Sequence, residues 1–453
     1  MHRYTAGLIV YQNLLQDELL RDLSAIFSRL ENDERRLQDD PSTLDSIISE
    51  VYRQIHKLLE LATVYGFDGN LWQNYLAWLL AMTENPFSFA CEKRGFRDGS
   101  VNQLVLHDLR LIHALFHYRF EPVEQALSIN CFSLITHYRA LEKEQKNYNW
   151  FVSSKVRALS CQLSEAEDEH QMLQVLTAFY QDHGAGVLGL NKAFRLKQAA
   201  YQPDGDFDLE PITNTFETTL DDLIGYDSQK QRLMDNTEAF ISGRKANNLL
   251  LHGESGTGKS TCMKAILNMY HSRGLRMIEI YKHQLNALSW LIAKIKNRNY
   301  KFIIYMDDLS FEEFETDYKY LKAVIEGGVE MTPDNILIYA TSNRRHLIKE
   351  TWTDRNDADP DDIHHSDTKE EKISLVNRFG VTIYFPRPDQ QVYLDIVRGI
   401  ALQHPELEMS DDELLEQAKR WGMWHGNISG RRARQFINHL LSQKQDGQQP
   451  SHD

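Results

Sequence analysis

The stretch GESGTGKS, residues 253–260, limits what this chain can fold into more than any other feature of its sequence. It follows the apolar run NLLLH, precedes a helical pattern, and has the spacing G-x-x-x-x-G-K-[ST]. Glycines at such a turn let backbone N–H groups point at phosphate oxygens, with a helix N-terminus behind them. This glycine-rich loop therefore predicts a nucleotide-binding site made of Gly253, Glu254, Ser255, Gly256, Thr257, Gly258, Lys259, Ser260 and Thr261.

Two side chains of the glycine-rich loop have specific expected roles. Lys259 can reach the β- and γ-phosphates of a nucleotide, and the Ser260 hydroxyl can ligate Mg²⁺. We therefore expect ATP and Mg²⁺ to bind here. A glycine-rich turn without a ligand is the competing explanation, and the strand–loop–helix context argues against it.

Short apolar segments alternate with helical stretches around this loop. Five of them are typical of strands: NLLLHG, RMIEIY, KFIIYM, NILIYAT and VTIYF. Strands separated by helices predict a parallel sheet that is covered on both faces. We therefore expect an α/β domain with a five-stranded parallel sheet over residues 216–388, followed by a helical lid over residues 389–443.

Two aspartates end the third of these strands, in the stretch FIIYMDDLSFEEFETDY. Because strand ends gather at the carboxyl edge of a parallel sheet, Asp307 can approach the Mg²⁺ held by Ser260. Asp308 is then the candidate for orienting an attacking water, with Glu312 or Glu313 as competitors beyond the strand end. Acidic capping of the following turn is the alternative explanation for Asp308.

These motifs, together with DDLIGYDSQKQRL ahead of the loop, resemble the AAA+ ATPase superfamily. More closely, DDLSFEEFETDYKYLKAVIEGGVEMTPDNILIYATSNRRHLI is similar to the predicted bacterial ATPases grouped as domain of unknown function 815. The resemblance covers most of the chain and implies a P-loop AAA+ fold. It also places Ile224 and Gly225 in the segment that lies beside adenine. The closer group is uncharacterised and implies no target.

The resemblance implies roles for four further polar residues. Asn343 matches a polar sensor of the γ-phosphate or the attacking water, and Arg378 matches an arginine finger supplied to a neighbouring subunit. Arg431 fits a second sensor at the start of a lid helix, with Arg434 as the competing choice. Positive charge near the γ-phosphate would stabilise the spread charge of the transition state. Surface ion pairs are the alternative explanation for Arg378 and Arg431.

The chain departs at Asp308 from many AAA+ members, which have glutamate at this position. Aspartate is one methylene shorter, and an error of about 1 Å in position can cost about a hundredfold in rate. The closer family resembles this chain in having paired aspartates, which favours adaptation over loss of activity. We expect a working hydrolase that is slow unless it is assembled.

The rest of the chain divides by composition and periodicity. Residues 1–198 show apolar residues at helical spacing and predict an all-helical N-terminal domain. Residues 199–215 gather Pro, Gly, Asp and Asn without periodicity, which predicts a linker. We expect a mobile loop at the acidic insertion 351–372 and a disordered tail over residues 444–453.

Charge and cysteine content limit the expected partners and cellular compartment of the protein. A net charge of −15 argues against a surface coated with nucleic-acid contacts. Lys294, Lys296, Arg298 and Lys301 could contact nucleic acid, but a solvated helix end is the better explanation. The cysteines form no CxxC pair, and no secretory signal or long apolar run is found. These features favour a cytoplasmic protein without a membrane segment.

Two functions fit these features. The first is an ATPase that remodels or loads a protein or protein–DNA assembly, with the helical N-terminal domain recruiting an unknown target. The second is a nucleotide-dependent switch or scaffold with little turnover. We expect a homo-oligomer, either a ring or a dimer, because an arginine finger at Arg378 would act on the ATP of a neighbouring subunit.

Overall fold

The structure is a computed structural model of the 453-residue chain. It divides into two compact units, Met1–Asn191 and Lys192–Asp453, and each is described by itself below. The structure describes residues 1–32, 41–94, 99–140, 149–198, 207–213, 215, 217–311, 315–326, 333–343, 347, 375–407, 409–426 and 428–446.

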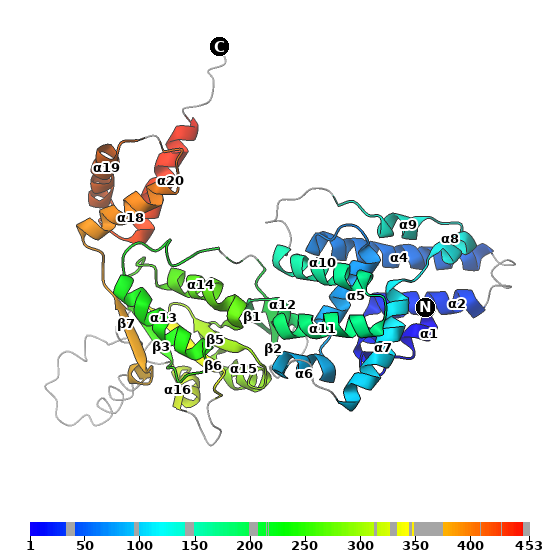
Figure 1. Ribbon diagram of the computed structural model, residues 1–453. Helices are drawn as coiled ribbons and strands as arrows, with labels where there is room; N and C mark the ends of the chain where they lie inside the picture. The colour runs from blue at the N-terminus through cyan, green and yellow to red at the C-terminus, as the bar shows by residue number, and fades with distance from the viewer. Residues whose placement is uncertain are drawn as a thin grey trace, which may run out of the picture. The chain divides into compact units, whose positions relative to one another are not determined.

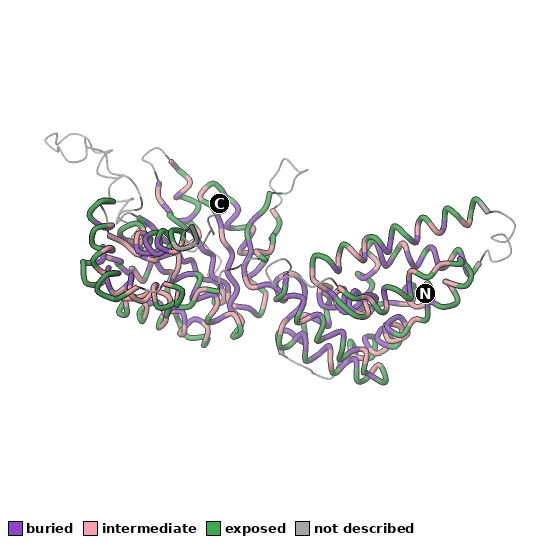
Figure 2. Tube along the Cα trace, turned by 90° about the horizontal axis from the view of Figure 1, so that it is seen from above, coloured by how far each residue is buried: buried purple, intermediate pink, exposed green. Residues whose placement is uncertain are grey.

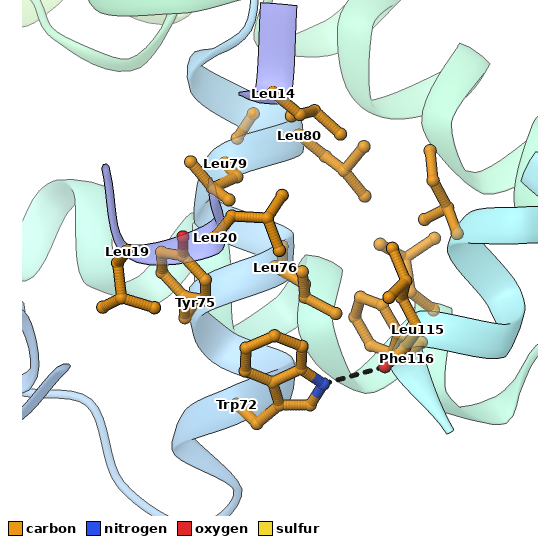
Figure 3. Packing of buried hydrophobic residues seen from close by; sticks show 14 of the residues in the cluster. Leu14, Leu19, Leu20, Trp72, Tyr75, Leu76, Leu79, Leu80, Leu115 and Phe116 are labelled. Atoms are coloured by element: carbon orange, nitrogen blue, oxygen red, sulfur yellow. Dashed lines mark hydrogen bonds between the residues drawn. The ribbon is translucent and has the colours of Figure 1, made fainter. Parts of the chain in front are cut away.

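The first unit is mainly helical, as the apolar spacing predicts. Its helix α5 is apolar on nearly every side, so neighbouring helices must enclose it. Figure 3 shows Trp72, Tyr75 and Leu76 of α5 among apolar side chains of the core, with Trp72 Nε1 donating to the Leu115 carbonyl oxygen over 2.8 Å. The helices (Figure 1) are α1 His2–Thr5, η1 Gln12–Gln16, α2 Glu18–Asn32, α4 Pro41–Tyr65, α5 Leu71–Met82, α6 Pro86–Arg94, α7 Ser100–Phe116, α8 Glu121–Leu127, α9 Cys131–Thr136, α10 Trp150–Glu165, α11 Glu169–Asp182 and α12 Gly186–Leu190.

A seven-stranded sheet forms the centre of the second unit. The strand order is β2-β1-β4-β5-β6-β3-β7, and only the edge strand β2 pairs antiparallel among the described strands. The five predicted strands are present as β3 to β7, but the prediction of a five-stranded, wholly parallel sheet is wrong. The strands are β1 Ala193–Gln198, β2 Phe207–Pro211, β3 Leu249–Gly253, β4 Leu275–Glu279, β5 Lys301–Met306, β6 Ile336–Ser342 and β7 Val381–Phe385.

The two additional strands correct two expected boundaries. β1 lies in the segment expected to be helical, residues 1–198, and β2 lies in the expected linker, residues 199–215. In β1, Phe194 and Leu196 are buried and the residue between them is exposed, which is the alternation of a strand with one solvated face. In β2, Leu209 is buried while charged neighbours stay in water, because an edge strand is covered on one side only.

Helices cover both faces of the sheet. In chain order they are α13 Asp227–Ile241, α14 Lys259–Tyr270, α15 Leu288–Ile295 and α16 Tyr318–Glu326, with 3₁₀ turns η3 His271–Arg273 and η4 Lys282–Ala287. Apolar side chains of α13 and α14 share one core cluster with alternate residues of the strands. Most intervening residues of β3, β5 and β6 are buried as well, and buried residues are purple in Figure 2. Burial on both faces is typical of parallel strands.

Three helices with their own apolar core end the second unit: α18 Gln390–Leu402, α19 Asp411–Trp424 and α20 Gly430–Asp446. They are drawn in orange to red in Figure 1. The Asp389 carboxylate caps α18 by accepting a hydrogen bond from the Val392 N–H over 2.8 Å.

The structure bears on three remaining expectations: the disordered tail, the acidic insertion and the lack of a membrane segment. Helix α20 continues to Asp446, so the prediction of a disordered tail is wrong for residues 444–446. Residues 447–453 and the acidic insertion 351–372 lie outside the described residues. Within the described part of the chain, every helix is too short or too polar to cross a membrane.

Candidate functional site

A cleft of about 470 Å³ lies at the carboxyl end of the sheet, where β5 and β6 end beside helices α18 and α20. This volume is within the range of small-molecule pockets, roughly 300 to 1,000 Å³. Most of the predicted site residues line it, whereas Gly225, Gly253, Glu254 and Arg378 do not. Those that do are Ile224, Ser255, Gly256, Thr257, Gly258, Lys259, Ser260, Thr261, Asp307, Asp308, Asn343 and Arg431.

The glycine-rich loop needs glycine for two different close approaches. Gly253 and Gly258 have φ angles of 140° and 95°, which favour glycine over any residue with a side chain. A Cβ on Gly253 would lie 2.1 Å from the Phe385 carbonyl oxygen, and one on Gly258 would lie 2.2 Å from Leu223 Cδ1. The loop therefore packs tightly between β7 and the segment before α13. The first turn of α14 follows at once, so its free N–H groups lie at the cleft wall, where they can bind an anion.

Lys259 is folded back onto its own loop. Its Nζ donates to the carbonyl oxygens of Gly253 and Glu254 at 2.9 and 2.7 Å, and to Asn343 Oδ1 at 3.0 Å. Burial lowers the pKa of this ammonium group, while nearby carboxylates, Asp308 first, oppose the shift. The three protons of Lys259 are thus satisfied inside the protein, and an anion entering the cleft would compete with these acceptors.

Asp307 connects β5 to the glycine-rich loop. Its Oδ1 accepts hydrogen bonds from Ser260 Oγ and Tyr305 OH, each at 2.7 Å, and from Thr341 Oγ1 at 2.6 Å. Burial acts to raise the pKa of Asp307, but the hydroxyl donors, Thr341 first, outweigh it and hold the pKa below its usual value. The carboxylate is therefore charged at neutral pH. Because Ser260 gives its proton to Asp307, its lone pairs stay available, and this pair of oxygen ligands fits Mg²⁺.

Asp308 has a left-handed backbone conformation, with a φ angle of 48°. Few residues with a side chain adopt this conformation, and aspartate tolerates it better than most. Its N–H donates to Thr341 Oγ1 over 2.9 Å, and its Oδ1 accepts from Asn343 Nδ2 over 2.7 Å. The two residues predicted to act on an attacking water therefore lie in direct contact. Glu312 and Glu313, the competitors for this role, lie outside the described residues.

Three isoleucines contribute to the apolar part of the cleft, beside Leu223 and Tyr226. Ile224, from the segment before α13, and Ile396 and Ile400, from α18, line it together. Ile224 also packs against the core of the three C-terminal helices. Gly225 stands behind this wall with a φ angle of 78°, and a Cβ there would lie 3.3 Å from Val392 Cγ1. An apolar slot of this kind can hold the flat ring of a nucleotide base.

Arg431 and Arg434 both line the cleft from the start of α20. The Arg431 N–H donates to the Gly256 carbonyl oxygen over 3.3 Å, which fixes the beginning of the helix against the glycine-rich loop. The first turn of α20 holds no acidic residue, and cations at a helix N-terminus are electrostatically unfavourable. An anion in the cleft would offset this repulsion, and both arginines are placed to contact it.

Arg378 lies outside this cleft and forms an ion pair with Glu326 at the end of α16. The resemblance described above implies that this arginine serves a neighbouring subunit and not its own chain. In that role, the ion pair with Glu326 would have to open before the guanidinium could reach a neighbouring cleft.

Residues 191–444 match the family model described as "Protein of unknown function (DUF815)". The match spans more than half of the 453-residue chain. The chain belongs to the DUF815 family. The matched part of this DUF815 protein starts one residue before the second unit and includes the whole cleft. No curated protein matches the chain in sequence.

The sequence motifs do not single out two side chains of the DUF815 site, Tyr305 and Thr341. Both contact Asp307 through their hydroxyl groups. Their signal in the sequence is positional, since residues two apart on a strand share a face. Tyr305 precedes Asp307 by two residues, and Thr341 precedes Asn343 by two.

Proposed function

We propose that this DUF815 protein is an Mg²⁺-dependent AAA+ ATPase that hydrolyses ATP to remodel or load a protein or protein–DNA assembly. The observation that carries the proposal is the 2.7 Å hydrogen bond from Ser260 Oγ to Asp307 Oδ1. It brings together the hydroxyl that follows the glycine-rich loop and the carboxylate at the end of β5. In phosphoryl-transfer sites, this pairing of groups holds Mg²⁺ next to the nucleotide phosphates.

In this proposal the glycine-rich loop and Lys259 bind the phosphates. Loop N–H groups and the first turn of α14 donate to phosphate oxygens, and Lys259 exchanges its three protein acceptors for them. The exchange is favourable because the phosphate charge stabilises the ammonium form that burial disfavours. Mg²⁺, when bound, would neutralise part of the phosphate charge. Ser260 and Asp307 would hold it.

The hydrolytic step is assigned to Asp308, with Asn343 beside it. The Asp308 carboxylate orients a water for attack on the γ-phosphate, and the Asn343 amide fixes the direction of that carboxylate. Arg431 or Arg434 would stabilise the charge that develops on the phosphate oxygens. Each of these four side chains lines the same cleft, which supports a shared role.

Arg378 is proposed to complete the cleft of a neighbouring copy, so the active form would be a homo-oligomer, either a ring or a dimer. The helical first unit is proposed to recruit the protein target, in the cytoplasm. The proposed reaction in the cleft does not depend on which target is recruited.

A nucleotide-dependent switch or scaffold with little turnover is the second candidate. The Asp308 contact favours it, because the short carboxylate is already engaged by the Asn343 amide at 2.7 Å. Aspartate would have to approach the water more closely than a glutamate would. Such a site would bind ATP and turn it over rarely.

One experiment separates these functions. Mg-ATP binding to the full-length protein is measured by calorimetry, and phosphate release is measured over a range of protein concentrations, with and without DNA. We expect binding and a rate per protomer that rises with protein concentration. Binding with no phosphate release at any concentration supports the switch, and absence of Mg-ATP binding refutes both functions.

A further inference from the structure

Thr341, near the end of β6, contacts three consecutive residues of the neighbouring chain segment. Its Oγ1 lies 2.6 Å from Asp307 Oδ1 and 2.9 Å from the Asp308 nitrogen. Its carbonyl oxygen accepts the Leu309 N–H over 2.7 Å. A single buried residue thus holds the chain where it leaves β5 and enters the cleft.

The direction of each hydrogen bond at the Thr341 hydroxyl is fixed by its partner. A charged carboxylate can only accept, so Thr341 gives its one proton to Asp307. A backbone N–H can only donate, so the Asp308 N–H must point at a lone pair of the same oxygen. The hydroxyl group therefore joins both aspartates at once, which a side chain without a hydroxyl could not do.

Asp307 is held in one orientation by this arrangement. Thr341, Tyr305 and Ser260 all donate to Oδ1, and none of these three bonds reaches Oδ2. Rotating the carboxylate would break all three bonds. Oδ2 is thus the oxygen that remains for a cation, and hydrogen-bonded partners of this kind fix the direction of metal-binding carboxylates.

Asp308 depends on Thr341 in a different way. Its left-handed conformation, with a φ angle of 48°, persists only where surrounding contacts hold it. The bond from its N–H to Thr341 is one such contact, and the bond from Asn343 to its carboxylate is another. Without the Thr341 hydroxyl, the Asp308 N–H would lose this hydrogen bond, and the backbone that carries the Asp308 carboxylate would be held less firmly.

We propose that Thr341 is a positioning residue for the ATPase reaction. Its hydroxyl group orients Asp307 toward Mg²⁺ and holds Asp308 in the conformation that places its carboxylate beside Asn343. The proposal rests on the proposed ATPase function and adds the residue that ties the metal ligand to the water-orienting residue.

Three substitutions in the full-length protein test this role. Thr341→Val keeps the shape and removes the hydroxyl, Thr341→Ser keeps the hydroxyl, and Tyr305→Phe removes a hydroxyl that contacts Asp307 but not Asp308. The matched control is Thr237→Val. Thr237 is also buried, and its hydroxyl bonds the Leu233 carbonyl oxygen and Tyr339 OH, outside the cleft.

Two quantities are measured for each variant: the Mg²⁺ concentration that half-saturates Mg-ATP binding, and the single-turnover rate at saturating Mg²⁺. For Thr341→Val we expect the first to rise about tenfold or more and the second to fall about tenfold or more, as is typical when a partner of a metal ligand is lost. Thr341→Ser should stay close to wild type. Tyr305→Phe should change only the Mg²⁺ requirement, and Thr237→Val should change neither quantity.

Two results would overturn the inference: wild-type values for Thr341→Val, or a Thr341→Ser variant as defective as Thr341→Val. If Thr341→Val does not fold, which its melting temperature reports, Thr341→Ala takes its place in both measurements with the same expected changes, and wild-type values for it overturn the inference. If the wild-type protein binds Mg-ATP without hydrolysing it, the proposed ATPase function is wrong. The Mg²⁺ concentration that half-saturates binding in each variant then still tests whether Thr341 orients Asp307. If ATP binds equally well with and without Mg²⁺, the proposed role of Thr341 is wrong, although the nucleotide site itself is real.

Discussion

Asn343 and Asp308 are joined by a 2.7 Å hydrogen bond from the side-chain amide to the carboxylate. The same amide accepts a hydrogen bond from Lys259 through its oxygen, at 3.0 Å. If Lys259 turns toward a phosphate, the Asn343 oxygen loses this donor, while its amide nitrogen can keep the bond to the Asp308 carboxylate. The Asn343 side chain therefore connects Lys259 with Asp308.

Removing the Lys259 side chain should abolish Mg-ATP binding. Lys259→Ala deletes the ammonium group that would contact the phosphates, and we expect at least a hundredfold loss of affinity by calorimetry. The fold should remain, since the lysine contacts loop carbonyls and Asn343 instead of apolar core. Lys264→Ala, an exposed lysine on the same helix, is the control. Unchanged ATP affinity in folded Lys259→Ala protein would show that the nucleotide site lies elsewhere.

Asp308→Asn should separate binding from hydrolysis. The substitution removes the acceptor charge and keeps nearly the same volume, so ATP should still bind while single-turnover hydrolysis falls by roughly a hundredfold or more. Glu312→Gln and Glu313→Gln should matter much less, because those residues lie four and five positions farther from the strand end than Asp308. Normal turnover in Asp308→Asn together with its loss in either glutamine variant would assign the role to a glutamate.

Arg378→Ala should bind ATP with wild-type affinity and lose most hydrolysis, at least tenfold, because the residue lies outside its own cleft. Mixing it with a Lys259→Ala variant should restore part of the rate, since one copy supplies the arginine and the other the ATP. Arg398→Ala is the control, because Arg398 also forms ion pairs, with Asp395 and Asp411. Full activity of Arg378→Ala in a strictly monomeric protein would remove the arginine from the mechanism.

ATP affinity should weaken at alkaline pH through Lys259. Burial lowers the pKa of the free lysine from its ordinary value of 10.5, and phosphate oxygens would raise it again. ATP therefore binds more tightly to the protonated form, so affinity is full below the free-state pKa and falls as pH rises through it. Calorimetry from about pH 7 to pH 10 measures this. In Lys259→Arg the guanidinium stays charged over this range, so a pH dependence that survives there must come from another group.

The parts of the fold that could be predicted are those with a strong local pattern. The five strands β3 to β7 are short, mostly apolar segments separated by helices, and the glycine-rich loop has a fixed spacing. The sequence does not predict β1 and β2, because each is short and has one solvated face: β1 lies at the end of the segment expected to be helical, and β2 lies among the Pro, Gly and Asp residues of the expected linker. Their pairing depends on the edge of β4, which no local pattern reports.

The candidate site shows the same division between local and long-range information. The motif spacing predicts Ser260 as a site residue, and the end of an apolar strand predicts Asp307. The structure brings their side chains together. The sequence gives no motif for Tyr305 and Thr341, because residues with a hydroxyl group are common inside apolar strands. Only the register between β5 and β6 places the Thr341 hydroxyl between the two aspartates.

The pairing of β1 has a consequence for the behaviour of a nicked chain. A protease that cuts once within residues 199–206 leaves β1 on the N-terminal piece and the other six strands on the C-terminal piece. Because β1 lies between β2 and β4 and bonds to both, the two pieces would share one sheet. We expect them to elute together under native conditions and to part only in denaturant.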